Sequence, residues 1–299
     1  MKLATFTEGN FTRIGRVAED MSGIVDLAKA APELPQEMVA FLSRGDEAMA
    51  RARAADSPVI PFERLVLESP VLRPPKFLGI GMNYAAHVAE AGHERPANQM
   101  WFAKQPLSIT GPRDPIVLPE ISRALDYECE LAIVIGRTCH RVPAEEAHEV
   151  VAGYTICNDG SVRDWQFKSP TTMLGKSFDH TSPVGPWIVT PDEIGNPHDL
   201  GLKTWVNGEL RQDARTSQLL FNCWEMIAEL SAAFTLEPGD ILATGTPQGV
   251  GAAMKPMQFL KAGDLVRMEI EKIGMLENPV VAEGPEIVSM FYKYIKTID

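Results

Sequence analysis

Three acidic residues occupy alternate positions just before a short apolar run of the chain. Asp126, Glu128 and Glu130 are spaced two apart, and the run 131–135 that follows is strand-like. Because side chains of an extended chain alternate between faces, Glu128 and Glu130 project from the same side, roughly 7 Å apart at about 3.3 Å per residue. Two carboxylates that close repel each other, and burying them without a partner costs several kcal/mol each. The pair therefore needs either a cation or contact with water.

A divalent cation would satisfy both glutamates. Ligands that are oxygen only suit magnesium, manganese or calcium better than zinc, which prefers histidine and cysteine. The alternative is a solvated strand face that carries acidic residues. The pentapeptide alone leaves both interpretations open.

A second chemical pair lies in the segment 83–90. If this segment is helical, His87 and Glu90 are three residues apart and share a face, so the carboxylate can orient the imidazole. That is the geometry of a general base and the group that orients it. The same spacing is also common on solvated helices, so the pair alone does not decide between the two.

Glycine-rich and turn segments add weaker signals. Gly160 permits a sharp turn after Asp159, and Lys176 stands in an apolar, proline-rich neighbourhood as either a charge donor or a surface residue. The segment 79–84 lacks the third glycine of a dinucleotide fingerprint. The segment 244–251 lacks the lysine of a phosphate loop, but its amides and hydroxyls could cup a carboxylate.

Composition limits the class of protein. The net charge is −12 and no basic run occurs, which argues against nucleic acid and anionic membrane surfaces as partners. The four cysteines show no metal-finger spacing and are expected to be reduced. The first residues do not resemble a signal peptide, and no window approaches about 18 apolar residues. We therefore expect a cytoplasmic protein.

The elements that position these residues are predicted to be mostly strands. Residues 1–73 form an opening unit with three short strands and a helix over 36–54, followed by prolines. Beyond Pro74, short strands separated by glycine and proline dominate, with helices expected at 84–91, 144–151 and 221–234. The pattern predicts a mainly β protein with some helices (α+β), not alternating βα units.

Together these segments match one family in sequence and in order. Between residues 74 and 280 the chain resembles the fumarylacetoacetate hydrolase family. The matching pieces are Asn83-Tyr84 with His87 and Glu90; Tyr127 to Leu131; Gly153-Tyr154 through Asn158-Asp159 to Arg163-Asp164 and Gln166; Gly175 to Asp179; Val206 to Glu209; and Pro238-Gly239-Asp240 through Thr244 to Gly251.

The resemblance implies a fold and a set of roles. The fold is a mixed β-sandwich roll in a catalytic unit, 74–299, with a small N-terminal α/β domain, 1–73, and the family usually forms homodimers. One magnesium or manganese ion is bound by a trio of acids, and calcium shares these ligands. The implied metal ligands are Glu128, Glu130 and Asp159; the implied catalytic residues are His87, Glu90 and Lys176; the implied substrate contacts are Tyr84, Arg163, Gln166 and Thr246.

The family also implies a class of reaction on a small 2-oxo acid. We expect hydrolysis of a carbon–carbon bond in an acylpyruvate or 2,4-dioxo acid, with water activated by His87 and Glu90 and the enolate stabilised by the metal and Lys176. The alternative is a decarboxylase or an isomerase (tautomerase) acting on oxaloacetate-like or 2-hydroxy-dienoate substrates. In the segment 101–108, Lys104 or Ser108 is a further candidate contact of the pocket.

Overall fold

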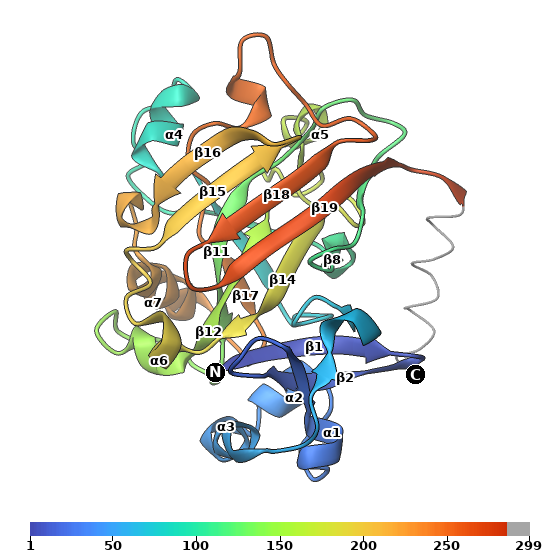
Figure 1. Ribbon diagram of the computed structural model, residues 1–299. Helices are drawn as coiled ribbons and strands as arrows, with labels where there is room; N and C mark the ends of the chain where they lie inside the picture. The colour runs from blue at the N-terminus through green and yellow to red at the C-terminus, as the bar shows by residue number, and fades with distance from the viewer. Residues whose placement is uncertain (286–299) are drawn as a thin grey trace.

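Two β-sheets stacked face to face form the body of the molecule (Figure 1). The computed structural model describes residues 1–285; the stretch 286–299, with which the predicted catalytic unit ends, lies outside the described residues. Several strand pairs within the two sheets are parallel although most are antiparallel, so both sheets are mixed. The expected α+β class, mainly β with a few helices, is confirmed.

The larger sheet has twelve strands and includes the two at whose ends the acidic residues Glu128, Glu130 and Asp159 lie. Ten of them follow in the order β4-β3-β2-β1-β14-β12-β11-β17-β6-β7, with β5 beside β1 and β8 beside β14. In chain order they are β1 (Lys2–Glu8), β2 (Phe11–Val17), β3 (Gly23–Asp26), β4 (Ile60–Pro61), β5 (Val66–Leu67), β6 (Phe77–Gly81), β7 (Met100–Ala103), β8 (Ile109–Thr110), β11 (Cys129–Ile135), β12 (Val151–Asn158), β14 (Ser182–Val189) and β17 (Ile241–Ala243).

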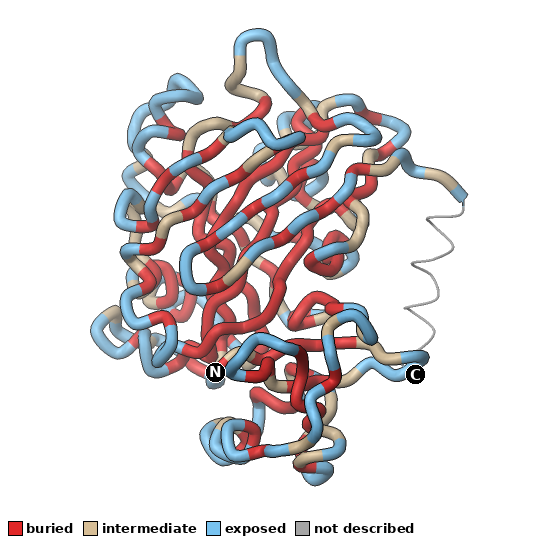
Figure 2. The backbone as a smooth tube through the Cα atoms, viewed as in Figure 1, coloured by how far each residue is buried: buried red, intermediate tan, exposed pale blue. Residues whose placement is uncertain are grey.

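The smaller sheet has five strands and covers one face of the larger one. Its order is β16-β15-β18-β19-β9. Buried and exposed residues alternate along β18, as expected for a sheet with one face on the core and one in water (Figure 2). Its strands are β9 (Ile116–Leu118), β15 (Gly201–Val206), β16 (Glu209–Arg215), β18 (Leu265–Ile270) and β19 (Gly274–Ala282), and a separate pair joins β10 (Leu125–Asp126) to β13 (Ser161–Val162).

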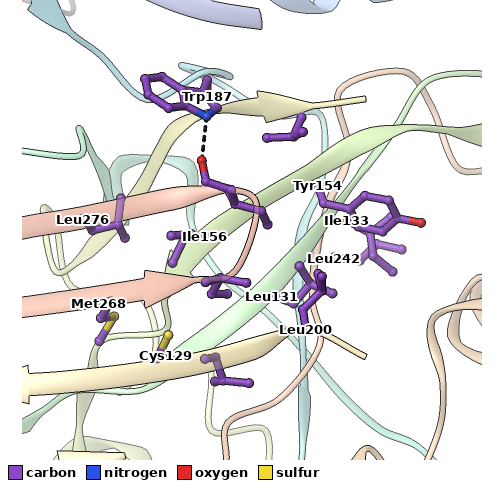
Figure 3. Packing of buried hydrophobic residues seen from close by; sticks show 14 of the residues in the cluster. Cys129, Leu131, Ile133, Tyr154, Ile156, Trp187, Leu200, Leu242, Met268 and Leu276 are labelled. Carbon is purple, nitrogen blue, oxygen red and sulfur yellow. Dashed lines mark hydrogen bonds between the residues drawn. The ribbon is translucent and has the colours of Figure 1, made fainter. Parts of the chain in front are cut away.

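The strand β11 is buried on both faces because apolar residues occupy every position of 131–135. Leu131 and Ile133 belong to the apolar cluster between the sheets, which also contains Met268 of β18 (Figure 3). Ala132 and Val134 point to the opposite face and belong to a second cluster. A strand fixed on both faces is a rigid base for the side chains at its first residues.

The N-terminal residues extend the larger sheet. β1 pairs with β14, with Lys2 opposite Val189, so the sheet continues across the predicted boundary at residue 73. The helices α1 (Leu27–Ala30), α2 (Met38–Leu42) and α3 (Gly45–Ala54) lie beside these strands (Figure 1). The single helix expected over 36–54 is wrong: the chain breaks between α2 and α3, where Gly45 has a φ of +63°. The two-domain division itself stays a prediction.

The remaining helices are short and lie between strands. The expectations at 84–91 and 221–234 are confirmed by α4 (Ala85–Glu90) and α7 (Cys223–Ala233), whereas 144–151 contains only a 3₁₀ turn, Ala147–Val150. The others are α5 (Arg163–Gln166), α6 (Pro191–Ile194) and the 3₁₀ turns Phe62–Arg64, Pro106–Ser108, Thr216–Gln218 and Gly251–Ala253. Within residues 1–285, none of the helices has the length and apolar character needed to span a bilayer.

Candidate active site

Three acidic side chains converge where β11 begins and β12 ends. Glu128 precedes β11, Glu130 is its second residue, and Asp159 follows β12. The two strands are antiparallel with Cys129 opposite Asn158, which brings the start of one to the end of the other. One carboxylate oxygen from each acid lies within 4.8 Å of the others, and all three residues are buried.

Two buried lysines form ion pairs with two of these carboxylates. The Lys176 ammonium lies 2.6 Å from Glu128 Oε2 and 2.6 Å from Asp159 Oδ2. The Lys104 ammonium lies 2.5 Å from Asp159 Oδ1, so both oxygens of that acid have a cationic partner. Of the two candidates in the segment 101–108, Lys104 reaches the centre, whereas the Ser108 hydroxyl donates only to a nearby backbone carbonyl.

Arg163 contacts the same centre through Glu128. Its Nη2 lies 2.6 Å from Glu128 Oε1, and its Nε donates to Asp126 Oδ2 at 2.9 Å. Its Nη1 donates to Gln166 Oε1 at 2.9 Å. Both predicted substrate contacts, Arg163 and Gln166, therefore lie beside the acidic centre, and Asp126 joins the network as the anchor of the guanidinium.

The pKa values of the two glutamates are shifted in opposite directions. Desolvation works to raise the pKa of Glu128, but the charges of Arg163 and Lys176 outweigh it and hold that pKa far below its ordinary range. Among the described residues no cation forms an ion pair with Glu130: burial, with the charges of Asp159 and Glu128, raises its pKa well above the ordinary value, although the charge of Lys176 opposes the shift. A buried acid beside two other acids is stabilised as a carboxylate by a cation, so the residues present fit a hard divalent ion.

The predicted base lies on α4 with its orienting acid. His87 Nδ1 is 3.3 Å from Glu90 Oε2, which confirms the shared helix face. The imidazole is close enough to Glu128 for a positive charge on it to lower the pKa of that carboxyl. Asn83, just before the helix, donates to the Thr244 carbonyl at 2.8 Å and so fixes the start of α4 against the following glycine-rich loop.

The loop 244–252 binds carboxylates of the chain itself. Its backbone N–H groups donate to Glu130 from Gly245 at 2.8 Å and to both oxygens of Glu90 from Gly249 at 3.0 and 3.2 Å. Gly245 and Gly249 have φ values of +95° and +102°, a backbone conformation that residues other than glycine rarely adopt. The same loop binds Asp126 through Gly251 and Ala252. The expected carboxylate cup thus connects the acidic centre to α4.

Two further predicted substrate contacts are buried in the protein. Tyr84 is 1 % exposed and belongs to the apolar cluster between the sheets, where burial raises its pKa well above the ordinary value. Thr246 donates its hydroxyl hydrogen to the Cys129 carbonyl at 3.1 Å and accepts from Gln212 Nε2 at 2.9 Å. These contacts indicate that Tyr84 packs in the core and that Thr246 positions the backbone. Contact of either residue with the substrate stays a prediction.

Sequence reasoning missed Gln212. This side chain comes from β16 of the smaller sheet, yet it binds the backbone between the two glutamates at Cys129 N. The strand sequence, with charged residues on both sides of Gln212, reads as a solvated edge. No local signal could have found it, because the contact joins residues far apart in the chain.

Residues 76–281 match the family model described as Fumarylacetoacetate (FAA) hydrolase C-terminal. The chain belongs to the fumarylacetoacetate hydrolase family. The match spans the acidic centre, α4 and the loop 244–252, so every part of the site lies inside the family unit.

Relatives within the fumarylacetoacetate hydrolase family carry out different reactions. A mitochondrial oxaloacetate tautomerase of Rattus norvegicus is 45 % identical, over 87 % of this chain and 84 % of the relative. The structure of a maleylpyruvate hydrolase from Sphingobium sp. SYK-6, in complex with manganese and pyruvate, is 34 % identical with a TM-score of 0.81, over 95 % of this chain and 100 % of that one. The structure of a 5-carboxymethyl-2-hydroxymuconate delta-isomerase from Mycobacterium smegmatis is 36 % identical with a TM-score of 0.76, with the same coverage. Family members are thus enzymes that include hydrolases and isomerases.

Proposed function

We propose that this protein is an oxaloacetate tautomerase that depends on a divalent cation. The observation that carries the proposal is the buried trio Glu128, Glu130 and Asp159 beside His87, in a chain 45 % identical to an oxaloacetate tautomerase over most of its length. This choice revises the hydrolysis expected from the sequence in favour of its alternative. The sequence did not separate them because both reactions generate an enolate next to a carboxylate.

The acidic trio would hold a magnesium or manganese ion, and the manganese in the maleylpyruvate hydrolase structure supports that choice. When bound, the ion supplies a Lewis acid for the carboxylate and keto oxygens of a 2-oxo acid. Arg163 keeps Glu128 ionised for this purpose. The cationic groups around the acids also favour an anionic substrate in a chain whose net charge is −12.

The reaction moves one proton between carbon 3 and the oxygen on carbon 2 of the substrate. His87 takes the proton from carbon 3 through Nε2, because Nδ1 is held by Glu90. The Lys176 ammonium donates a hydrogen bond to the oxygen on carbon 2, where negative charge develops. The protonated His87 then gives this proton from Nε2 to that oxygen, which yields the enol and restores the neutral imidazole, and the reverse steps return the keto form. No bond between heavy atoms breaks.

Hydrolysis of an acylpyruvate remains a second candidate. The observation that favours it is the His87–Glu90 pair, which is the arrangement needed to activate water, together with the likeness to a maleylpyruvate hydrolase. In this reaction water oxygen enters the carboxylic acid product and pyruvate leaves. The expected homodimer and cytoplasmic location stay predictions.

The decisive experiment offers the purified protein both substrates with magnesium or manganese. For tautomerisation, we expect the protein to speed up the decay of the ultraviolet absorbance of enol-oxaloacetate, with no release of carbon dioxide or pyruvate. A chelator that removes the cation should abolish this acceleration. Carbon dioxide release would instead indicate a decarboxylase. Oxygen from labelled water in the acid released from an acylpyruvate would support hydrolysis. No turnover of either substrate would refute the proposal.

A further inference from the structure

The backbone of Cys129 lies between the two glutamates at a place where β11 lacks a neighbouring strand. On one side β12 pairs with the whole of β11, starting with Cys129 opposite Asn158. On the other side β17 begins to pair only at Ala132. The N–H and C=O of Cys129 on that side therefore need partners other than a strand, since buried backbone groups are almost always paired.

Two side chains replace the missing strand. Gln212 Oε1 accepts from Cys129 N at 3.1 Å, and the Thr246 hydroxyl donates to the Cys129 carbonyl at 3.1 Å. Gln212 Nε2 donates to the Thr246 oxygen at 2.9 Å, which closes a ring of three hydrogen bonds around one residue. The ring fixes the extended backbone from which Glu128 and Glu130 project to the same face.

All hydrogen-bonding groups of the Gln212 side chain are used. Its oxygen also accepts from the Thr204 hydroxyl at 2.8 Å, and its nitrogen also donates to the Pro247 carbonyl at 2.9 Å. The amide orientation is fixed, because Cys129 N can only donate and Pro247 O can only accept. Gln212 is 1 % exposed, so any bond that it loses is not replaced by bulk water.

The position of Gln212 depends on an irregularity in the smaller sheet. Thr204 pairs with Gln212 and Trp205 with Leu210, so Arg211 is an extra residue in β16. A bulge of this kind redirects neighbouring side chains. The bulged strand also lies against the loop 244–252, because a Cβ on Gly249 would approach the Arg211 carbonyl oxygen to 2.0 Å.

We infer that Gln212 is a positioning residue of the cation centre, acting through the Cys129 backbone and the loop at Thr246. None of its hydrogen bonds goes to a carboxylate of the trio. It sets the spacing of Glu128 and Glu130 and, through the loop, the Gly245 N–H that binds Glu130. The inference rests on the proposed function, because it requires that the acidic trio binds a divalent ion. It adds a residue from the second sheet to that site.

The test measures binding of Mn²⁺ alone, without substrate, by the electron paramagnetic resonance signal of free Mn²⁺. Gln212→Leu should weaken Mn²⁺ binding about 10- to 100-fold, the range for lost partners of metal ligands. Thr246→Val should do the same, and Thr246→Ser, which keeps the hydroxyl, should bind nearly as well as the wild type. The double variant Gln212→Leu with Thr246→Val should be less than additive, because both belong to one ring.

The matched control is Asn278→Leu in β19. Asn278 is also a buried amide of the smaller sheet, and it donates to the carbonyls of Gly111 and Asp114 at 3.1 and 2.7 Å, away from the acidic trio. This variant should lower the melting temperature without changing Mn²⁺ affinity.

Equal Mn²⁺ affinity in the wild type, Gln212→Leu and Thr246→Val would overturn the inference. If Gln212→Leu does not fold, the Thr246→Val and Thr246→Ser pair decides alone. Absence of Mn²⁺ binding in the wild type would instead refute the cation site, so failure of the proposed function is distinguishable.

Discussion

Two regions of this protein bury acids, and they do so in opposite ways. In the active site the carboxylates of Glu128 and Asp159 contact the cations Lys176, Lys104 and Arg163. Near the N-terminal strands, Glu68 is also buried and Asp114 is half-buried, but in the part of the chain described their hydrogen-bond donors are neutral. Burial alone therefore does not mark a site of chemistry; the partners do.

The difference appears in protonation. Burial, reinforced by the charge of Asp114, raises the pKa of Glu68 to about 7, although the Thr7 hydroxyl opposes the shift. In the active site the cations reverse the effect of burial on Glu128. The active site thus keeps Glu128 charged, whereas Glu68 keeps a proton up to neutral pH.

The largest expected effect comes from removing a charge in the acidic trio. Glu130→Gln keeps the shape and loses the ligand charge, so we expect Mn²⁺ affinity to fall by at least about 100-fold and turnover by about 1,000-fold. Calorimetric titration and steady-state kinetics would measure this. Glu68→Gln is the matched control, with unchanged affinity and turnover. Equal losses in both variants would remove the distinction between the regions.

The next prediction separates the role of the general base, His87, from that of the metal ligands. His87→Ala should lower turnover about 100- to 10,000-fold, the usual contribution of a general base, because proton transfer at carbon 3 loses its acceptor. Mn²⁺ affinity should stay within about threefold, since the acidic trio is intact. A parallel loss of cation binding would show instead that α4 supports the trio.

A stability measurement tests whether folding depends on the ion pairs of the buried acids in the active site. Arg163→Met leaves Asp126 and Glu128 without their guanidinium partner and should lower the free energy of unfolding by about 3 kcal/mol. Arg137→Met, which removes an exposed pair with Asp46, should cost no more than about 1 kcal/mol. Urea denaturation measures both, and equal costs would contradict the argument.

The last expected effect is a gain of stability on replacing Glu68, the buried acid near the N-terminal strands. The folded state raises the pKa of Glu68 from 4.5 to about 7, so it holds more protons than the unfolded state between those values and loses stability as the pH rises. Glu68→Gln cannot ionise and still accepts from Thr7. It should nearly match the wild type near pH 4.5 and exceed it by about 3 kcal/mol at pH 8. Parallel stability curves of the two proteins against pH would exclude this account.

Local geometry made part of the site predictable. The shared face of Glu128 and Glu130 follows from strand alternation, and that of His87 and Glu90 from helical spacing, so both pairs were found from the residues. Asp159 entered only through the family resemblance, because its approach depends on how β11 and β12 pair. The three-bond ring at Gln212 depends on the stacking of two sheets, which no spacing along the chain encodes.

The fold was predictable to a similar degree. Short apolar runs between glycines and prolines indicated strands, and the α+β class followed from them. The order of the strands did not follow from these runs, because strands far apart in the chain are neighbours: β1 lies beside β14, and β17 beside β6. Helix propensity over 36–54 did not reveal the interruption at Gly45, where a left-handed backbone residue ends one helix and starts the next.

The pairing of β1 with β14 has a consequence for how the chain reaches this structure. Contacts between Lys2 and Val189 close a very long loop, and such non-local contacts slow folding. Until they form, Ile188 and Val189 at the end of β14 lack their β1 neighbours. An exposed strand edge can recruit a strand from another molecule, so newly made chains are more vulnerable to aggregation before this junction closes.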